Sequence, residues 1–189
     1  MLTIDPKQEA ARITKFIRDL LKQQGFENVI IAVSGCIDST TTLYLLARAI
    51  APSQIIVVHL PYDSSSFAMI KALSTQLRIP PKNTLELLIK PVADLLARTL
   101  GIDKKDRVRF GNIMARVRMI LLYDLAKKHH ALVCGTENKS EYYLGYFTRF
   151  GDEASDFEPI RHLFKTQVYQ LAKHLGVQDE IIKQKPTAG

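Results

Sequence analysis

The chain has 189 residues, of which 47% are hydrophobic and 24% charged, and its formal net charge is +7. This length suits one domain with a real core, and the composition excludes a disordered or fibrous protein. No apolar run approaches the roughly 18 residues that a membrane-spanning helix needs. The start, MLTIDPKQEAARITKF, lacks the charged and apolar blocks of a signal peptide. We therefore expect a cytoplasmic protein that binds no membrane.

The positive charge and the two cysteines do not by themselves indicate a class of function. The basic residues are spread along the chain without a block of five or six like charges, so a polyanion as small as ATP or a dinucleotide would account for them. Charge alone does not exclude nucleic acid. Cys36 and Cys134 are far apart, have no companions at metal-ligand spacing and follow or lie within apolar strand patterns. We expect two buried thiols and no disulfide.

The first half of the chain alternates helical and strand patterns. Apolar residues at helical spacing predict a helix over 6–24, which Gly25 ends. The continuous apolar run over 28–33 predicts a strand covered on both faces. The elements predicted after it are a helix over 40–50, a strand over 54–60, a helix over 66–77, a strand over 84–89 and a helix over 92–100.

The second half begins with a long predicted helix over 107–130. Its core face is expected to carry Ile113, Val117, Ile120, Leu121 and Leu125. A strand over 131–134 and helices over 166–175 and 179–183 follow. Strands that alternate with helices indicate βαβ units with right-handed crossovers. We predict an α/β fold, a doubly wound and mostly parallel sheet with helices on both faces, as one domain over 1–189.

One loop carries the first sign of chemistry. The strand over 28–33 runs directly into SGCIDS (34–39), and a helix follows. This arrangement aims backbone N–H groups at one point beyond the carboxyl end of a strand, where phosphate binds. Asp38 would suit a bound Mg²⁺ better than a bare phosphate. A capped turn without any ligand remains the alternative, and the loop matches neither GxxxxGK[ST] nor GxGxxG.

The loop resembles the SGGxDS pyrophosphate-binding loop of ATP pyrophosphatases, which release AMP and PPi. Further segments resemble NAD synthetases in particular and follow in that family's order. They are GNIMARVRM (111–119), GTENKSE (135–141), GYFTRFGD (145–152), DFEPI (156–160), KT (165–166) and KPTA (185–188). The resemblance covers essentially the whole chain. It implies a Rossmann-like fold of the adenine nucleotide alpha hydrolase type.

The resemblance also implies site residues. It assigns to ATP binding the positions Ser34, Gly35, Cys36, Ile37, Asp38, Ser39, Thr136, Lys165 and Thr187. Asp38 and Glu141 match the carboxylates that hold Mg²⁺, and two hard oxygen ligands completed by water and phosphate are typical of that ion. Lys165 matches a lysine on the phosphates, where its charge would stabilise the adenylation step. Asp38 and Lys165 are thus the implied catalytic residues.

Deamido-NAD is the second substrate that the resemblance implies. Arg116, Arg149 and Asp156 match its binding positions, and HLPYD (59–63) lies where the family approaches adenine. The implied reaction joins the nicotinate carboxylate to AMP, with release of PPi, and free ammonia then displaces AMP to give NAD. The family also implies a homodimer and no nucleic-acid partner. A second apolar stripe on the 107–130 helix (Met114, Met119, Leu122) suggests the contact surface, unless that helix is simply a core helix.

Three departures from the family pattern keep alternatives open. Cys36 replaces the second glycine of SGGxDS, where a positive φ would strain a cysteine. Glu153, Ala154 and Glu158 replace the Gly-Gly and Asn of GDGGxDxNP, and the family's segment beyond PTA does not follow here. The alternatives are another ATP pyrophosphatase, such as a GMP synthetase or a tRNA-modifying enzyme, and a catalytically impaired nucleotide-binding homologue.

Overall fold

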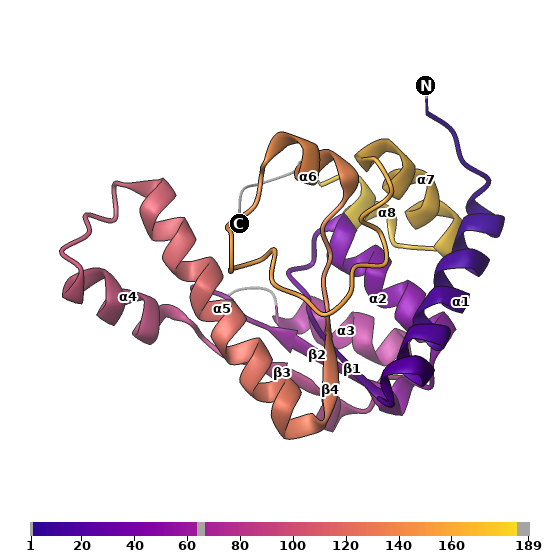
Figure 1. The fold of residues 1–189 in the computed structure, drawn as a ribbon, viewed down its shortest axis with the longest axis horizontal. Coiled ribbons are helices and arrows are strands. Elements are labelled where there is room, and N and C mark those ends of the chain that lie inside the picture. Colours follow the sequence, from indigo (N-terminus) through magenta and orange to yellow (C-terminus); the bar gives the residue numbers. More distant parts are fainter. Residues whose placement is uncertain (1, 64–66, 185–189) are drawn as a thin grey trace.

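A four-stranded parallel sheet in the order β3-β2-β1-β4 forms the centre of the molecule (Figure 1). The computed structural model describes residues 2–63 and 67–184. The strands are β1 (Asn28–Ala32), β2 (Ile55–His59), β3 (Thr84–Glu86) and β4 (Ala131–Cys134). Each of the three strand pairings is parallel, as the alternation of helices and strands in the sequence predicts.

Helices cover both faces of this sheet. One face packs against α1 (Pro6–Gln24), α2 (Ile37–Ala49), α3 (Phe67–Gln76), α7 (Lys165–Leu175) and α8 (Asp179–Ile182). The other face packs against α4 (Lys90–Thr99) and α5 (Arg107–His129). The short α6 (Lys139–Leu144) follows β4, and the turns η1 (Pro52–Gln54) and η2 (Pro81–Asn83) precede β2 and β3. The predicted doubly wound α/β fold is confirmed.

The continuous apolar strands have a simple cause in this arrangement. In β1, Val29 and Ile31 belong to the core under α1, α2 and α7, whereas Ile30 belongs to the core under α4 and α5. All three side chains are fully buried. Successive residues of a strand face opposite sides, so a strand that is covered twice must be apolar at every position.

The order of the strands fixes where a ligand fits. From β1 the chain continues outward through β2 and β3, and it then returns to place β4 on the other side of β1. The direction of winding therefore changes between β1 and β4. Open α/β sheets bind ligands at such a switch point, beyond the carboxyl ends of the two strands. The loops after β1 and after β4 are consequently the two to inspect.

Several boundaries differ from the sequence prediction. α2 begins at Ile37, inside the loop, and not at residue 40. β3 ends at Glu86, which pairs with His59, the last residue of β2, and Leu87 and Leu88 are exposed beyond it. The helix α6 was not predicted at all. Residue 66, where the third helix was expected to begin, lies outside the described residues.

The long helix α5 has a different core face from the one predicted. Leu122 is buried in the core, so it cannot belong to an exposed contact stripe, and that part of the prediction is wrong. Ile120, which was expected in the core, is 59% exposed. Over the 23 residues of this helix, a regular apolar repeat drifts around the helix axis away from the buried face. Among residues 2–63 and 67–184, no helix is both long and apolar enough to span a membrane.

Candidate active site at the β1–β4 switch point

The 34–39 loop after β1 takes its shape from one glycine. Gly35 has φ +88°, and a Cβ on it would lie 2.1 Å from Cε of Met69. The positive φ favours glycine, and the flexible Met69 side chain would have to shift to admit a Cβ. Cys36 has φ −73° and ψ 165° and is the N-cap of α2. The position at which the family pattern has a second glycine therefore needs no left-handed backbone here.

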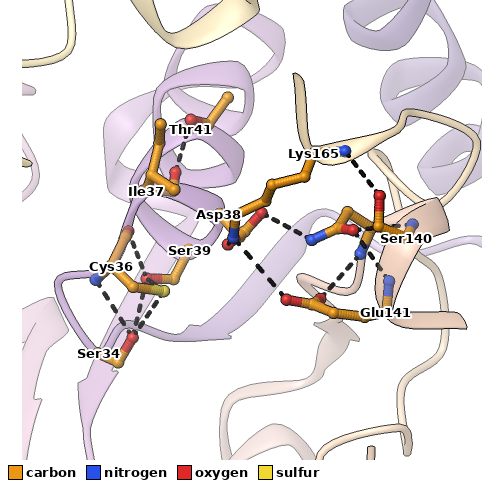
Figure 2. Close-up of polar contacts among 10 residues, drawn as sticks. Ser34, Cys36, Ile37, Asp38, Ser39, Thr41, Ser140, Glu141 and Lys165 are labelled. Carbon is orange, nitrogen blue, oxygen red and sulfur yellow. Dashed lines mark hydrogen bonds and ion pairs between the residues drawn. The ribbon is translucent and has the colours of Figure 1, made fainter. Parts of the chain in front are cut away.

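The polar groups of this loop bond to one another (Figure 2). Ser34 Oγ accepts a hydrogen bond from the Cys36 N–H (3.3 Å) and donates one to Cys36 Sγ (3.1 Å). Ser39 Oγ donates to the Cys36 carbonyl (3.2 Å). Cys36 is exposed, so the expected burial of its thiol is wrong, whereas Cys134 is buried as expected. The loop thus gathers hydroxyl and N–H donors at the positive end of α2, where phosphate is favoured.

A cluster of charges joins the loop after β1 to the loop after β4. Lys165, the first residue of α7, pairs with Oδ2 of Asp38 and lies 3.8 Å from Oε1 of Glu141 (Figure 2). Asp38 lies in the first turn of α2, and its side chain is only 7% exposed. These three residues are far apart in the sequence, and the fold brings them together at the switch point.

Asn138 holds the second half of this cluster in place. Its Oδ1 accepts hydrogen bonds from the N–H groups of Ser140 (3.0 Å) and Glu141 (3.1 Å), which caps α6. Its Nδ2 donates to Oδ1 of Asp38 (3.0 Å). Glu141 closes a capping box by accepting from the Asn138 N–H (3.2 Å). Asn138 thus fixes both carboxylates at once, and it is fully buried.

The charges in the cluster perturb one another. Burial, and then the nearby Asp38 carboxylate, raise the pKa of Glu141. Burial alone would lower the pKa of Lys165, but the charge and hydrogen bond of Asp38 and the charge of Glu141 outweigh it and raise that pKa. Lys165 is therefore a firmly protonated cation held between two carboxylates.

This donor set fits Mg²⁺. Asp38 and Glu141 supply hard oxygen atoms from two different elements, and a lysine ammonium already lies between them. The place between the two carboxylates therefore favours positive charge. Mg²⁺ usually takes only one or two protein carboxylates and fills its remaining positions with water and substrate phosphates. Two carboxylates beside a phosphate-binding loop meet that requirement.

Two of the residues expected at deamido-NAD lie next to each other. The Arg116 side chain extends from α5, and its Nε donates to the carbonyl of Arg149 (3.3 Å). Both arginines are exposed, and the Arg149 guanidinium lies 4.9 Å from the ring centre of Phe150. Phe150 in turn lines an open cleft. The pair therefore presents two cations at the border of that cleft.

Asp156 lies in the same cleft, which has a volume of about 520 Å³. Its Oδ2 accepts a hydrogen bond from the N–H of Val133 in β4 (2.7 Å), so it also ties the 152–157 segment to the sheet. The cleft is lined by Tyr123, Phe150, Glu153, Ala154, Ser155, Asp156, Phe157, Glu158 and Arg161. Asp156 thus lines the cleft itself, whereas Arg149 adjoins it through Phe150 and Arg116 contacts Arg149.

The remaining expected residues have simpler outcomes. Thr136 is half-buried in the loop after β4, on the same edge of the sheet as the 34–39 loop. Thr187 lies outside the described residues. Sequence reasoning missed Asn138, although Asn138 and Glu141 have the spacing of a capping box, which is a readable helix-start signal. It also missed Glu137 and Arg161, for which no pattern in the sequence gave a signal.

Comparison with known proteins places this chain in a family. The NAD synthase family model matches residues 9–189. An NH3-dependent NAD synthetase from Thermoplasma acidophilum is 42% identical over 188 residues, which are 98% of this chain and 75% of that protein.

Solved structures agree with these sequence matches. An NH3-dependent NAD synthetase from Campylobacter jejuni has a TM-score of 0.88 at 32% identity, over 96% of this chain and 78% of that one. An NMN synthetase from Francisella tularensis has a TM-score of 0.87 at 31% identity, over 98% and 77%. With a family model that matches nearly every residue and a fold that overlays on solved members, this chain belongs to the NAD synthase family.

Proposed function

We propose that the cluster at the β1–β4 switch point catalyses the ATP-dependent amidation of deamido-NAD by ammonia, through an adenylated intermediate. NAD synthases are ligases that form a C–N bond, and this chain is one of them. The single observation that supports the assignment to this site is the meeting of Asp38, Glu141 and Lys165 beside the 34–39 loop. We further propose that residues 1–189 act as one domain.

In the first step, the nicotinate carboxylate attacks the α-phosphorus of ATP and PPi leaves. The N–H and hydroxyl groups of the 34–39 loop, now bonded to one another, turn to the phosphate oxygens. Lys165 lies beside the loop and supplies a fixed positive charge where negative charge builds up. Asp38 and Glu141 would hold Mg²⁺, which would neutralise phosphate charge and orient the leaving group. No covalent bond to the protein is needed, so positioning and electrostatics account for the catalysis.

The dinucleotide is proposed to lie in the cleft beside this cluster. Arg116 and Arg149 present cations at its border, which suits the pyrophosphate of deamido-NAD. Asp156 presents a carboxylate that suits a ribose hydroxyl. Thr136 and Thr187 are proposed to contact ATP. In the second step, ammonia attacks the activated acyl carbon and AMP leaves.

The cellular compartment and the oligomeric state complete the proposal. ATP and deamido-NAD are both solutes of the cytoplasm, and we propose that the protein works there. We also propose a homodimer, with an interface over the exposed apolar side chains of α4 and α5, Leu95, Val108 and Ile120 among them. Sedimentation equilibrium would test this, because a monomer at micromolar concentration contradicts it.

A product analysis tests the reaction. The purified chain is incubated with deamido-NAD, MgATP and ammonium chloride, and nucleotides are separated by chromatography. We expect NAD, AMP and PPi in equal amounts, and no reaction when glutamine replaces ammonium. ADP and phosphate as products, or ATP cleavage that does not need deamido-NAD, would exclude the proposal. A parallel reaction with nicotinate mononucleotide, motivated by the similarity to an NMN synthetase, tests whether the smaller acid is preferred.

A further inference from the structure

Glu137 is a buried carboxylate that lacks hydrogen bonds. The residue is 5% exposed, and neither carboxylate oxygen has a hydrogen-bond partner. Among the residues that the structure describes, its ion-pair partner is Arg161, whose Nη1 lies 3.5 Å from Oε2. Burying a carboxylate without hydrogen bonds is unfavourable, so such a group points to a missing partner.

Arg161 cannot fully compensate Glu137, because it is shared. Its Nη1 also pairs with the Glu158 carboxylate, and its guanidinium lies 4.4 Å from the ring centre of Tyr142. Two carboxylates therefore compete for one cation. Glu158 is one of the residues in which this chain departs from the family pattern, so this competition is a feature of its own substrate loop.

Glu158 and Arg161, the two charged neighbours of Glu137, line an open cleft that carries an excess of negative charge, and Glu137 itself is not among its lining residues. Glu153, Asp156 and Glu158 line it, and Arg161 is the one cation among its lining residues. Burial, and then the Glu158 carboxylate, raise the pKa of Glu137 to about 7, and Asp152 and Glu153 add to the rise while Arg161 opposes it. These carboxylates favour a small cation beside the anionic dinucleotide that is proposed to occupy the same cleft.

The chemistry of the cleft selects the kind of cation. A bare metal ion offers no N–H or O–H group to the two Glu137 oxygens. A small cation that donates hydrogen bonds fits better, because the two Glu137 oxygens are acceptors without donors. Ammonium carries one charge and four N–H donors. It is also the predominant form at neutral pH of the substrate that supplies nitrogen.

The loop after β4 connects this cleft to the adenylation cluster. Asn138 faces Asp38 and bonds to it (3.0 Å), while the preceding Glu137 faces Arg161 and Glu158. Gly135 lets the 155–158 segment pack against the loop, because a Cβ there would lie 2.7 Å from Cγ of Glu158. Neighbouring residues of one short loop thus contact Asp38 on the adenylation side and Arg161, which lines the acidic cleft.

We propose that Glu137 binds the ammonium ion and accepts a proton from it. This inference rests on the function proposed above. Ammonium gives one proton to the Glu137 carboxylate, and the nitrogen lone pair so released forms the C–N bond to the acyl carbon. The bond from that carbon to the AMP phosphate oxygen breaks, and its electron pair leaves with AMP. The new amide nitrogen then loses its extra proton to solvent.

The test separates the two half-reactions. Glu137→Gln keeps the shape of the side chain and removes its charge. We expect the KM for ammonium to rise about tenfold or more, as the loss of a hydrogen-bonded charge implies, and the KM values for ATP and deamido-NAD to stay within about twofold. The exchange of PPi into ATP, which needs deamido-NAD and no ammonium, should be unchanged. Glu27→Gln, an exposed carboxylate on the chain between α1 and β1, is the control.

Further readouts distinguish binding from structure. Glu137→Asp retains the charge and should recover part of the ammonium affinity that Glu137→Gln loses. The wild-type to Glu137→Gln ratio of kcat/KM for ammonium should increase as the pH rises through about 7, where the wild-type carboxylate ionises. If Glu137→Gln does not fold, the same kinetic measurements on Glu137→Asp test the proposal. The expected rise in the KM for ammonium is then about threefold.

Three results would overturn the inference or its basis. An unchanged KM for ammonium in a folded variant with normal PPi exchange would reduce Glu137 to a structural partner of Arg161. Equal losses in PPi exchange and in ammonium use would also refute a specific role in the second step. The absence of PPi exchange in the wild-type protein would instead reject the proposed function itself.

Discussion

The two sides of the loop after β4 differ in how their charges are matched. On the adenylation side, Lys165 pairs with Asp38 and approaches Glu141, and Asn138 bonds to both carboxylates. On the cleft side, Glu137 and Glu158 share one arginine. The first cluster is ready to exchange its internal bonds for phosphate and Mg²⁺. The second retains uncompensated negative charge, which a cation from solution would neutralise.

The largest expected effect is on the adenylation side. Asp38→Asn removes the carboxylate that pairs with Lys165 and is proposed to hold Mg²⁺. We expect NAD formation and PPi exchange to fall together, by about 10²- to 10³-fold, because electrostatic stabilisation of the transition state is lost. Steady-state rates and circular dichroism of both proteins measure this. Asp19→Asn, an exposed residue of α1 that pairs with Lys15, is the control. Normal PPi exchange in Asp38→Asn would show that the metal assignment is wrong.

The next effect concerns the border of the cleft. Arg116→Ala should raise the KM for deamido-NAD by about 10- to 100-fold, since it removes a charged group that is proposed to contact the dinucleotide. The KM for ATP should change by less than about twofold. Arg109→Ala, an exposed arginine at the start of the same helix, is a matched control. Equal changes in both KM values for Arg116→Ala would assign this residue to holding the Arg149 carbonyl instead.

A prediction on stability sharpens the contrast between the two sides. The folded protein raises the pKa of Glu137 from 4.5 to about 7, so it binds this proton more tightly than the unfolded chain does. Stability is therefore present at low pH and is lost as the pH rises from about 4.5 through 7. Glu137→Gln removes this loss. Its stability relative to wild type should increase by about 1–3 kcal/mol between pH 5 and pH 8, as measured by urea unfolding. A difference that does not change with pH would mean that Arg161 keeps Glu137 ionised.

The sequence predicted the adenylation side far better than the cleft side, for physical reasons. The 34–39 loop is continuous in sequence and follows a strand pattern, so its place at the edge of the sheet could be predicted directly. The switch point then required Glu141 and Lys165 to meet it, although only the resemblance named them. Glu137 and Arg161 come from two irregular loops, whose contact depends on how the 152–164 segment folds back onto β4. No periodicity encodes such a contact.

The predictions of helices and strands were right or wrong according to whether burial could be inferred from residue polarity. The buried strands were found because a strand covered on both faces must be apolar throughout. The start of α2 was placed three residues late because Asp38 and Ser39 are polar, and the sequence pattern did not show that the switch point buries them. The exposure of Cys36 was missed for a related reason. A thiol after a strand looks apolar, yet as the N-cap of α2 it faces the ligand side.

The smallest expected effect distinguishes two neighbouring positions of the phosphate loop. Cys36 has φ −73°, so Cys36→Gly relieves no backbone strain, and the gain in ATP affinity expected for a left-handed cysteine should not appear. The variant loses the Sγ contact with Ser34 Oγ (3.1 Å) and gains flexibility in the unfolded chain. We expect kcat/KM for ATP to change by less than about threefold, with no change for deamido-NAD.

Gly35→Ala is the informative counterpart. Its φ of +88° strains any residue that has a Cβ, and Cε of Met69, 2.1 Å from that Cβ, would have to move, so ATP use should fall more than in Cys36→Gly. Steady-state kinetics at saturating deamido-NAD and ammonium measure both variants. A large loss in Cys36→Gly would give the thiol a role that its exposed position and its hydrogen bonds do not explain. A dead wild-type enzyme restored by Cys36→Gly would mean that the cysteine itself blocks the phosphate site, and that this chain is a nucleotide binder that has lost its catalysis.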